Sequence, residues 1–389
     1  MIKSIVALSI SAIALSASGN LDASMACKAC HATIYSEFQN SPHKKASIYG
    51  DKVHKAIWDK HPAKAKEKYQ CAKCHTPSDK KLMVSLEKGE SALPQNNSIQ
   101  NTQPISCAYC HQIKDVEKHS KANKNIMTSK PKTLYSARVG QKADNNVEYK
   151  EKTSWFGMVK ETTGSPFHDI DFTNENFYSG KTCTGCHSHK QNSHKLAICD
   201  MEIGKKNVTK ETCISCHMPQ VEGSFVHSKD SKTHAYHGFT GVLHKPQMLN
   251  KFVDLGFKKL ADGFDITIKN SASHSLLLHP LRVGELKVSI IRANKEQKLE
   301  SIQFKRVLSD DNNTATMPWL ATKVFQDNHI KAGEVRKINF KSNVQKGDVI
   351  EVKLGHYTVN PKVAPKLGLD KEKDLTTFRL FKKERFIVK

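Results

Sequence analysis

The last part of the chain alternates between apolar and polar residues. From residue 263 onward, β-branched or aromatic residues recur at every second position, and turn-forming residues separate the alternating stretches. These stretches cover residues 263–270, 282–291, 298–308, 334–340, 348–359 and 375–388. Six or seven antiparallel strands within about 130 residues predict an immunoglobulin-like β-sandwich for residues 251–389.

The preceding part, residues 19–250, has a different pattern. Its secondary structure is predicted to be sparse and mostly helical, with one helix over residues 54–69 (HKAIWDKHPAKAKEKY). Residues 95–104 are rich in Asn, Gln and Ser and are predicted to form a loop, as are residues 130–146. The chain therefore divides into two regions of unlike architecture.

The first 18 residues, MIKSIVALSISAIALSAS, form a third segment. Lys3 precedes an apolar run from Ile5 to Ala17, and small residues follow. This layout is typical of a cleaved secretory signal, and the run is shorter than the ~20 residues that a membrane-spanning helix needs. We therefore expect a signal peptide at residues 1–18, no transmembrane segment after its cleavage, and a periplasmic location.

Composition adds a strong basic charge. The 61 Lys and Arg residues against 38 Asp and Glu residues give a formal net charge of +23. Such a surface favours redox partner proteins with acidic docking surfaces and small anions such as nitrite, and it is compatible with peripheral contact with anionic lipid headgroups. The expected export and the lack of any nucleic-acid-binding motif argue against nucleic acid as a partner.

Ten of the eleven cysteines lie in five copies of the pentapeptide C-x-x-C-H. Eleven Cys and 20 His among 389 residues would give roughly 0.02 such pentapeptides by chance. The cysteine pairs are Cys27 and Cys30, Cys71 and Cys74, Cys107 and Cys110, Cys183 and Cys186, and Cys213 and Cys216. The histidines that follow them are His31, His75, His111, His187 and His217.

This pentapeptide predicts covalent attachment of c-type haem. Two thiols three positions apart can each join one vinyl group of a porphyrin, and the next histidine can then bind the iron. Zinc sites also use C-x-x-C, but zinc binding does not explain a histidine directly after the second cysteine of every pair. A disulfide between two cysteines with only two residues between them is seldom comfortable. We expect five covalently bound haems, and we expect residues 19–250 to fold only around them.

Fifteen further histidines are available for the sixth coordination position of the irons. A second histidine there is typical of an electron carrier, whereas an open position lets a haem bind substrate. The preferred distal candidates are His43, His54, His119, His168 and His237, and the secondary candidates are His61, His194 and His234. The histidines after residue 250 are expected to be ordinary polar residues, but His274 and His279 flank an apolar turn that could lean on the haem-bearing region. Cys199 is expected to be a buried, inert thiol.

Three stretches resemble the multihaem cytochromes of the c-552/c-554 type. CKACHATIYSEFQNSPHKKA is similar to their opening repeat, and CISCHMPQ, followed later by THAYHGFTG, is similar to their CxxCHMP element and histidine–glycine segment. NSASHSLLLHPLRVGELKVSI resembles a C-terminal β-domain of such proteins, but it lacks their Pro-Thr-Gly turn. The resemblance implies bis-histidine haems packed edge to edge, with His43 as an axial ligand.

Two redox functions remain open from the sequence, beside a third role in haem storage or structural scaffolding. The surplus of histidines favours a periplasmic carrier that passes electrons between respiratory partners rather than an enzyme. The alternative is a reductase of a small nitrogen or sulfur oxyanion with one open haem. Pentahaem nitrite reductases in the broader superfamily usually carry a lysine in the catalytic haem motif, whereas all five motifs here end in histidine.

Overall fold

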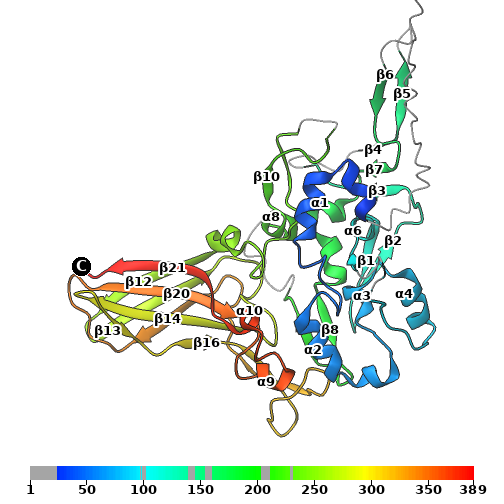
Figure 1. Ribbon diagram of the computed structural model, residues 1–389. Coiled ribbons are helices and arrows are strands. Elements are labelled where there is room, and N and C mark those ends of the chain that lie inside the picture. The colour runs from blue at the N-terminus through cyan, green and yellow to red at the C-terminus, as the bar shows by residue number, and fades with distance from the viewer. Residues whose placement is uncertain are drawn as a thin grey trace, which may run out of the picture.

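The computed structural model describes residues 24–96, 98, 102–138, 145–153, 160–202, 211–227 and 231–389. The expected signal peptide therefore lies outside the described residues. Figure 1 shows two regions: one of short helices and hairpins, and one of long strands that extends to the side and carries the C-terminus at its far end. We call them the N-terminal region and the β region. Within the described residues, no helix is long and apolar enough to cross a membrane.

The N-terminal region contains only short helices. The longest is α2 (Lys52–Lys60), whose first turn is capped because the Asp51 carboxylate accepts hydrogen bonds from the backbone amides of Val53 and His54. The others are η1 (Ser24–Ala29), α1 (Ala32–Gln39), η2 (Pro62–Lys66), α3 (Ala72–His75), α4 (Lys80–Glu87), α6 (Cys107–His111), α7 (Glu175–Ser179), η3 (Lys181–Gly185) and α8 (Cys213–His217).

The prediction of one helix over residues 54–69 is wrong beyond Lys60. His61 adopts an extended conformation, with φ −75° and ψ 133°, because it precedes Pro62 and the proline ring disfavours helical geometry there. A short 3₁₀ turn, η2, follows and ends at Glu67, which has φ 50°. The chain therefore changes direction before it reaches Cys71.

Short hairpins supplement these helices, a feature that the sequence pattern did not predict. One three-stranded sheet joins β3 (Thr133–Tyr135), β7 (Asp169–Asp171) and β4 (Asn146–Val147), so the predicted loop over residues 130–146 is wrong at β3 and at its last residue, where β4 begins. The hairpins are β1 (Ile113–Glu117) with β2 (Lys124–Met127), β5 (Lys150–Thr153) with β6 (Lys160–Thr163), β8 (His189–Gln191) with β9 (Ala197–Asp200), and β10 (Gln220–Glu222) with β11 (Thr233–Ala235). The β5–β6 hairpin projects away from the rest (Figure 1).

The β region follows η4 (Pro246–Phe252) and consists mainly of two antiparallel sheets. The first has the order β12 (Val253–Leu260), β13 (Gly263–Asn270) and β19 (Val335–Phe340). The second has the order β15 (Lys295–Lys298), β14 (Val283–Arg292), β20 (Val349–Tyr357) and β21 (Arg379–Ile387), with β16 (Ile302–Phe304) also paired to β14. A further hairpin joins β17 (Arg306–Ser309) and β18 (Lys323–Asp327).

The predicted strands are confirmed, with two exceptions. The stretch 298–308 forms two short strands, β16 and β17, rather than one, and the stretch 375–388 begins in a short helix, so that its strand β21 starts at Arg379. One hydrophobic core takes side chains from both sheets, including Phe264 and Ile266 from β13 and Leu286 and Ile350 from β14 and β20. Phe264 lies opposite Phe340 in the register, and their rings stack with centroids 5.4 Å apart.

A separate apolar cluster joins the two regions. Ala56 of α2 packs with Val359 and with Ala364 and Leu367 of α9 (Ala364–Leu367). Lys52 forms an ion pair with Glu372, next to α10 (Lys373–Thr376). The β region thus packs against the helix that precedes the second C-x-x-C-H motif.

Truncation in the shared core should destabilise the β region. Ile266 is fully buried, so Ile266→Ala should lower the free energy of unfolding by about 2–5 kcal/mol. Ile387→Ala is the matched control, because that side chain is 68% exposed and should cost less than about 1 kcal/mol. Scanning calorimetry of the full chain measures both; equal losses would show that this core does not stabilise the region.

Candidate multihaem site

Each of the five motifs lies on a helical turn. Backbone hydrogen bonds join the histidine amide to the carbonyl of the first cysteine, at 2.8 Å for His31 and Cys27 and 2.8 Å for His187 and Cys183. Residues at positions i, i+3 and i+4 share one helix face, so both thiols and the imidazole of a motif face the same side. All eleven cysteines have free thiols. Ten of them therefore stand where thioether bonds to a porphyrin can form.

Side-chain caps start two of these turns. Ser106 accepts a hydrogen bond from the Tyr109 amide at the start of α6. Thr212 and Ser215 form a reciprocal capping box at the start of α8. Caps satisfy backbone donors that a turn this short leaves unpaired, so polar residues next to the cysteines stabilise the motif conformation.

Backbone carbonyls hold four of the five motif histidines. The Nδ1 atoms of His31, His111 and His217 lie 2.7, 2.6 and 2.6 Å from the carbonyl oxygens of Phe225, Tyr135 and Thr240. His75 Nδ1 lies 3.0 Å from the Ala46 carbonyl. A carbonyl can only accept, so each Nδ1 carries the proton and each Nε2 keeps its lone pair. Metal-binding histidines need this tautomer and are commonly held in this way.

Four motif histidines face a second imidazole. Ring centres lie 6.3 Å apart for His31 and His168, and 6.3 Å for His111 and His237. The pair His43 and His187 is separated by 5.9 Å, and the pair His217 and His274 by 6.1 Å. Two imidazole nitrogens that bind one metal from opposite sides, each at about 2 Å, place their ring centres roughly 6 Å apart. The spacing fits an iron ion between each pair.

The facing histidines have the matching tautomer. Nδ1 of His237 donates to the Ala235 carbonyl at 2.7 Å, and Nδ1 of His274 donates to the Ser275 carbonyl at 2.8 Å. His168 makes a longer contact of 3.4 Å with the Asp169 carbonyl. Their Nε2 atoms therefore keep a lone pair, as a metal ligand requires.

Burial keeps two of the facing imidazoles neutral. Burial lowers the pKa of His237 to about 3. The pKa of His43 is also lowered to about 3, mainly by burial and in addition by the positive charge that the nearby His187 and His75 can carry. His43 Nδ1 is a buried atom without a hydrogen-bond partner among the described residues. Iron binds only neutral imidazole, so this environment suits a ligand.

The second motif differs from the other four. His54 faces His75 with ring centres only 3.7 Å apart, and their Nδ1 atoms are separated by 2.7 Å. His54 Nε2 is 3.2 Å from the Tyr69 hydroxyl. This spacing leaves no room for a metal ion between the two rings, in contrast to the other pairs.

The remaining sequence candidates lie elsewhere. In His119, Nδ1 accepts a hydrogen bond from the backbone amide of Lys121. In His61, Nδ1 accepts one from the backbone amide of Ala63. Both rings therefore carry their proton on Nε2. His194 is exposed, and His234 uses both nitrogens, on the Gly223 carbonyl and the Glu37 carboxylate. Among the described residues, none of these four rings contacts a motif histidine.

His274 is the residue whose placement the sequence pattern did not anticipate, because it lies among the strands. The one signal that pointed to it is the apolar turn after it, which could lean on the N-terminal region. Cys199 is exposed on β9, so the expectation of a buried thiol is wrong. Partial desolvation by neighbouring protein atoms nevertheless raises the pKa of its thiol.

The motifs adjoin one another. The Cys107 amide of motif three donates to the Ser24 hydroxyl beside motif one at 3.1 Å. The Cys186 sulfur of motif four lies 4.0 Å from the Lys73 carbonyl of motif two, and Gly180, just before motif four, packs against Cys213 of motif five. The Asn125 amide lies between the Tyr109 hydroxyl and the Cys186 sulfur, at 3.0 and 3.8 Å, and so links motif three to motif four.

One glycine permits this packing. Gly180 has φ +75°, and a Cβ added there would lie 2.9 Å from Cys213 Cβ. A side chain at this position would therefore clash with the fifth motif, and the left-handed backbone would be strained as well.

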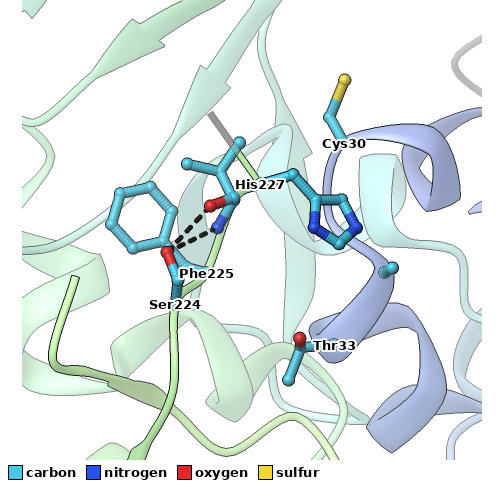
Figure 2. A pocket seen from close by; sticks show the side chains of 7 residues that line it. Cys30, Thr33, Ser224, Phe225 and His227 are labelled. Carbon is cyan, nitrogen blue, oxygen red and sulfur yellow. Dashed lines mark hydrogen bonds between the residues drawn. The ribbon is translucent and has the colours of Figure 1, made fainter. Parts of the chain in front are cut away.

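A pocket lies beside the first motif. Figure 2 shows Ser224 and Phe225 on one side of it, and on the other the imidazole of His227 between Cys30 and Thr33. The His227 amide donates to the Cys30 carbonyl at 3.0 Å, so two segments far apart in sequence meet here. Within the described residues, no three His, Cys, Asp or Glu side chains converge as a metal site of their own.

Comparisons with known proteins bear on the first three motifs and on the overall fold. Residues 26–112, which contain the first three motifs, match the family described as cytochrome c554 and c-prime. The fold is similar to the crystal structure of a penta-heme cytochrome c552 from Thermochromatium tepidum, with a TM-score of 0.68 and 19% identity over 95% of this chain and all of that chain. No curated protein matches the sequence.

The N-terminal region should lose its structure without haem. Its main apolar cluster contains few side chains, among them Trp58, Tyr69 and Leu82, whereas the β region has its own core. In a full chain produced without haem attachment, we expect rapid hydrogen exchange over residues 24–250 and protection over 253–388. Protection across both regions would contradict this expectation.

Proposed function

From the premise that the chain resembles the multihaem cytochromes of the c552/c554 family, we propose that it is a pentahaem electron carrier. One observation carries the proposal: second imidazoles face motif histidines at ring-centre separations of 5.9 to 6.3 Å. In this proposal His168, His43 and His237 supply sixth ligands for the first, fourth and third motifs. Filled sixth positions favour electron transfer over substrate binding.

The protein would set the properties of the bound groups through its own side chains. A c-type haem at each motif would supply an iron that accepts and releases one electron. Two neutral imidazoles per iron give a lower reduction potential than a histidine and a methionine. The carbonyls at Phe225 and Tyr135 fix the proton on Nδ1 and strengthen Nε2 as a ligand.

The contacts between motifs support an order for the electron path. Motif one adjoins motif three, Asn125 links three to four, and motif four adjoins both two and five. The attachment sites thus form a connected series from motif one through three and four to two and five, and haems held there would supply a chain of one-electron centres.

The wider setting is also a proposal. Export by the N-terminal segment would place the protein in the periplasm, where c-type haem attachment and redox partners are found in bacteria. The charge of +23 would guide docking to acidic partner proteins and would permit peripheral contact with anionic lipids. The two sheets with a shared core would form the predicted immunoglobulin-like sandwich.

Removal of a sixth ligand tests the carrier. His237→Gly should convert one of five low-spin ferric haems to high-spin, and added imidazole should restore the low-spin signal. His119→Gly is the matched control, because His119 is another candidate from the sequence but accepts a hydrogen bond at Nδ1. Electron paramagnetic resonance measures both variants; an unchanged spectrum for His237→Gly would refute its assignment.

A second candidate function rests on the unusual second motif. The ring facing His75 lies too close to share a metal ion, and it is hydrogen-bonded to Tyr69. His54 and Tyr69 lie on the Nδ1 side of His75, so neither would fill the position across a haem held by Cys71, Cys74 and His75, and that position would be open to a substrate. This arrangement suits reduction of a small nitrogen or sulfur oxyanion.

The second candidate predicts one high-spin haem in the unaltered protein. That signal should disappear in a Cys71→Ser, Cys74→Ser, His75→Gln variant, together with reduction of nitrite by a dye-reduced sample. Low-spin signals from all five haems of the unaltered protein would exclude this candidate and leave the carrier.

A further inference from the structure

We infer that the β region completes the fifth haem site, with His274 as its sixth ligand. The inference rests on the proposed attachment of a haem at Cys213 and Cys216. His274 lies just after β13, 57 positions beyond His217 in the numbering, yet the two rings are nearly parallel, with centres 6.1 Å apart and an interplanar angle of 14°. A histidine of the β region therefore stands where an iron held by His217 needs its second axial nitrogen.

Both imidazoles have the tautomer that this role requires. His217 Nδ1 donates to the Thr240 carbonyl at 2.6 Å, and His274 Nδ1 donates to the Ser275 carbonyl at 2.8 Å. Both protons are thus accounted for on the atoms that point away from the shared site. The two Nε2 atoms keep their lone pairs for a metal.

A fully buried asparagine positions the loop that carries His274. The side-chain amide of Asn270 donates to the His274 carbonyl at 2.9 Å and to the Lys331 carbonyl at 3.0 Å, and its oxygen accepts from the Ala272 amide at 2.9 Å. Leu276 adds a backbone hydrogen bond to the Ile330 carbonyl at 3.0 Å. Because both ends of the loop are tied to one strand connection, His274 is held in place before any metal binds.

Polar contacts from the N-terminal region reach the same loop. The buried Ser275 hydroxyl donates to the Glu202 carboxylate, and Lys331 Nζ lies 3.3 Å from the other oxygen of that carboxylate. Glu202 thus bridges the loop and the strand connection beneath it. The contact between the regions and the placement of His274 are parts of one arrangement.

His279 is the competing histidine of this segment. Its Nδ1 accepts a hydrogen bond from the Leu281 amide at 3.2 Å, which leaves the proton on Nε2. That tautomer cannot present Nε2 to a metal, so the geometry selects His274. His279 also lies near enough to His75 of the second motif to interact with it electrostatically, so it is not an inert control.

The β region would thus take part in the redox chemistry by supplying a ligand. Iron coordination at the fifth motif would depend on correct docking of the β region, and it would in turn hold the two regions together. Separation of the regions would leave one iron without its sixth ligand, with a higher potential and an open face.

Substitution of the ligand tests this directly. In the full, haem-loaded protein, His274→Gly should turn one of five haems high-spin, and imidazole should reverse the change, whereas the control His119→Gly should leave all five unchanged. Asn270→Ala should produce a partial high-spin fraction, because it releases the loop without removing the ligand. A wholly low-spin His274→Gly protein would overturn the inference.

A second variant covers a failure to fold. His274→Met keeps a ligand at the position, so it should remain six-coordinate and raise the potential of one haem, seen in a redox titration. Unchanged potentials for all haems would also overturn the inference. If the unaltered protein carries fewer than five haems, the proposed function fails. If it carries five haems but the His274 variants have the spectra and potentials of the unaltered protein, the role of His274 alone is refuted.

Discussion

The hydrogen bond from a motif histidine to a distant carbonyl organises the N-terminal region. His31 is held by Phe225, 194 positions away, and His111 and His217 are held by Tyr135 and Thr240, 24 and 23 positions away. Each bond fixes one proton on Nδ1, and so it fixes which nitrogen can bind a metal. Chain segments without long helices are therefore placed by the requirements of the imidazoles they support.

This constraint explains why a region with a small apolar core has a defined path. Hydrogen bonds and close contacts join neighbouring motifs, and Gly180 approaches the fifth motif as closely as its missing side chain allows. The fold is arranged around attachment sites rather than around packed secondary structure. The β region shows the opposite principle, with alternating side chains that fill one core between two sheets.

The sequence predicted what depends on local pattern. The strand at 263–270 coincides with β13 because alternation and the flanking turns are local signals, and the five motifs were evident from their spacing alone. The helix over 54–69 failed because the effect of Pro62 on His61 outweighs a helical pattern of apolar residues.

Pairing between histidines could not be predicted, because it depends on tertiary structure. His168 meets His31 across 137 positions, and His274 was assigned to the strands by its place in the chain. His119 follows its motif closely in sequence, yet its Nδ1 accepts a backbone amide and its ring points to no motif histidine among the described residues. The direction of the Nδ1 hydrogen bond separates these cases, and only the folded chain shows it.

The number of covalently attached haems is the quantity on which this account depends. Intact mass spectrometry under denaturing conditions, on protein from a host that matures c-type cytochromes, measures it directly. The account predicts a polypeptide carrying five haem masses that resist extraction. A polypeptide of unmodified mass with free thiols, or with zinc in place of porphyrin, would contradict it.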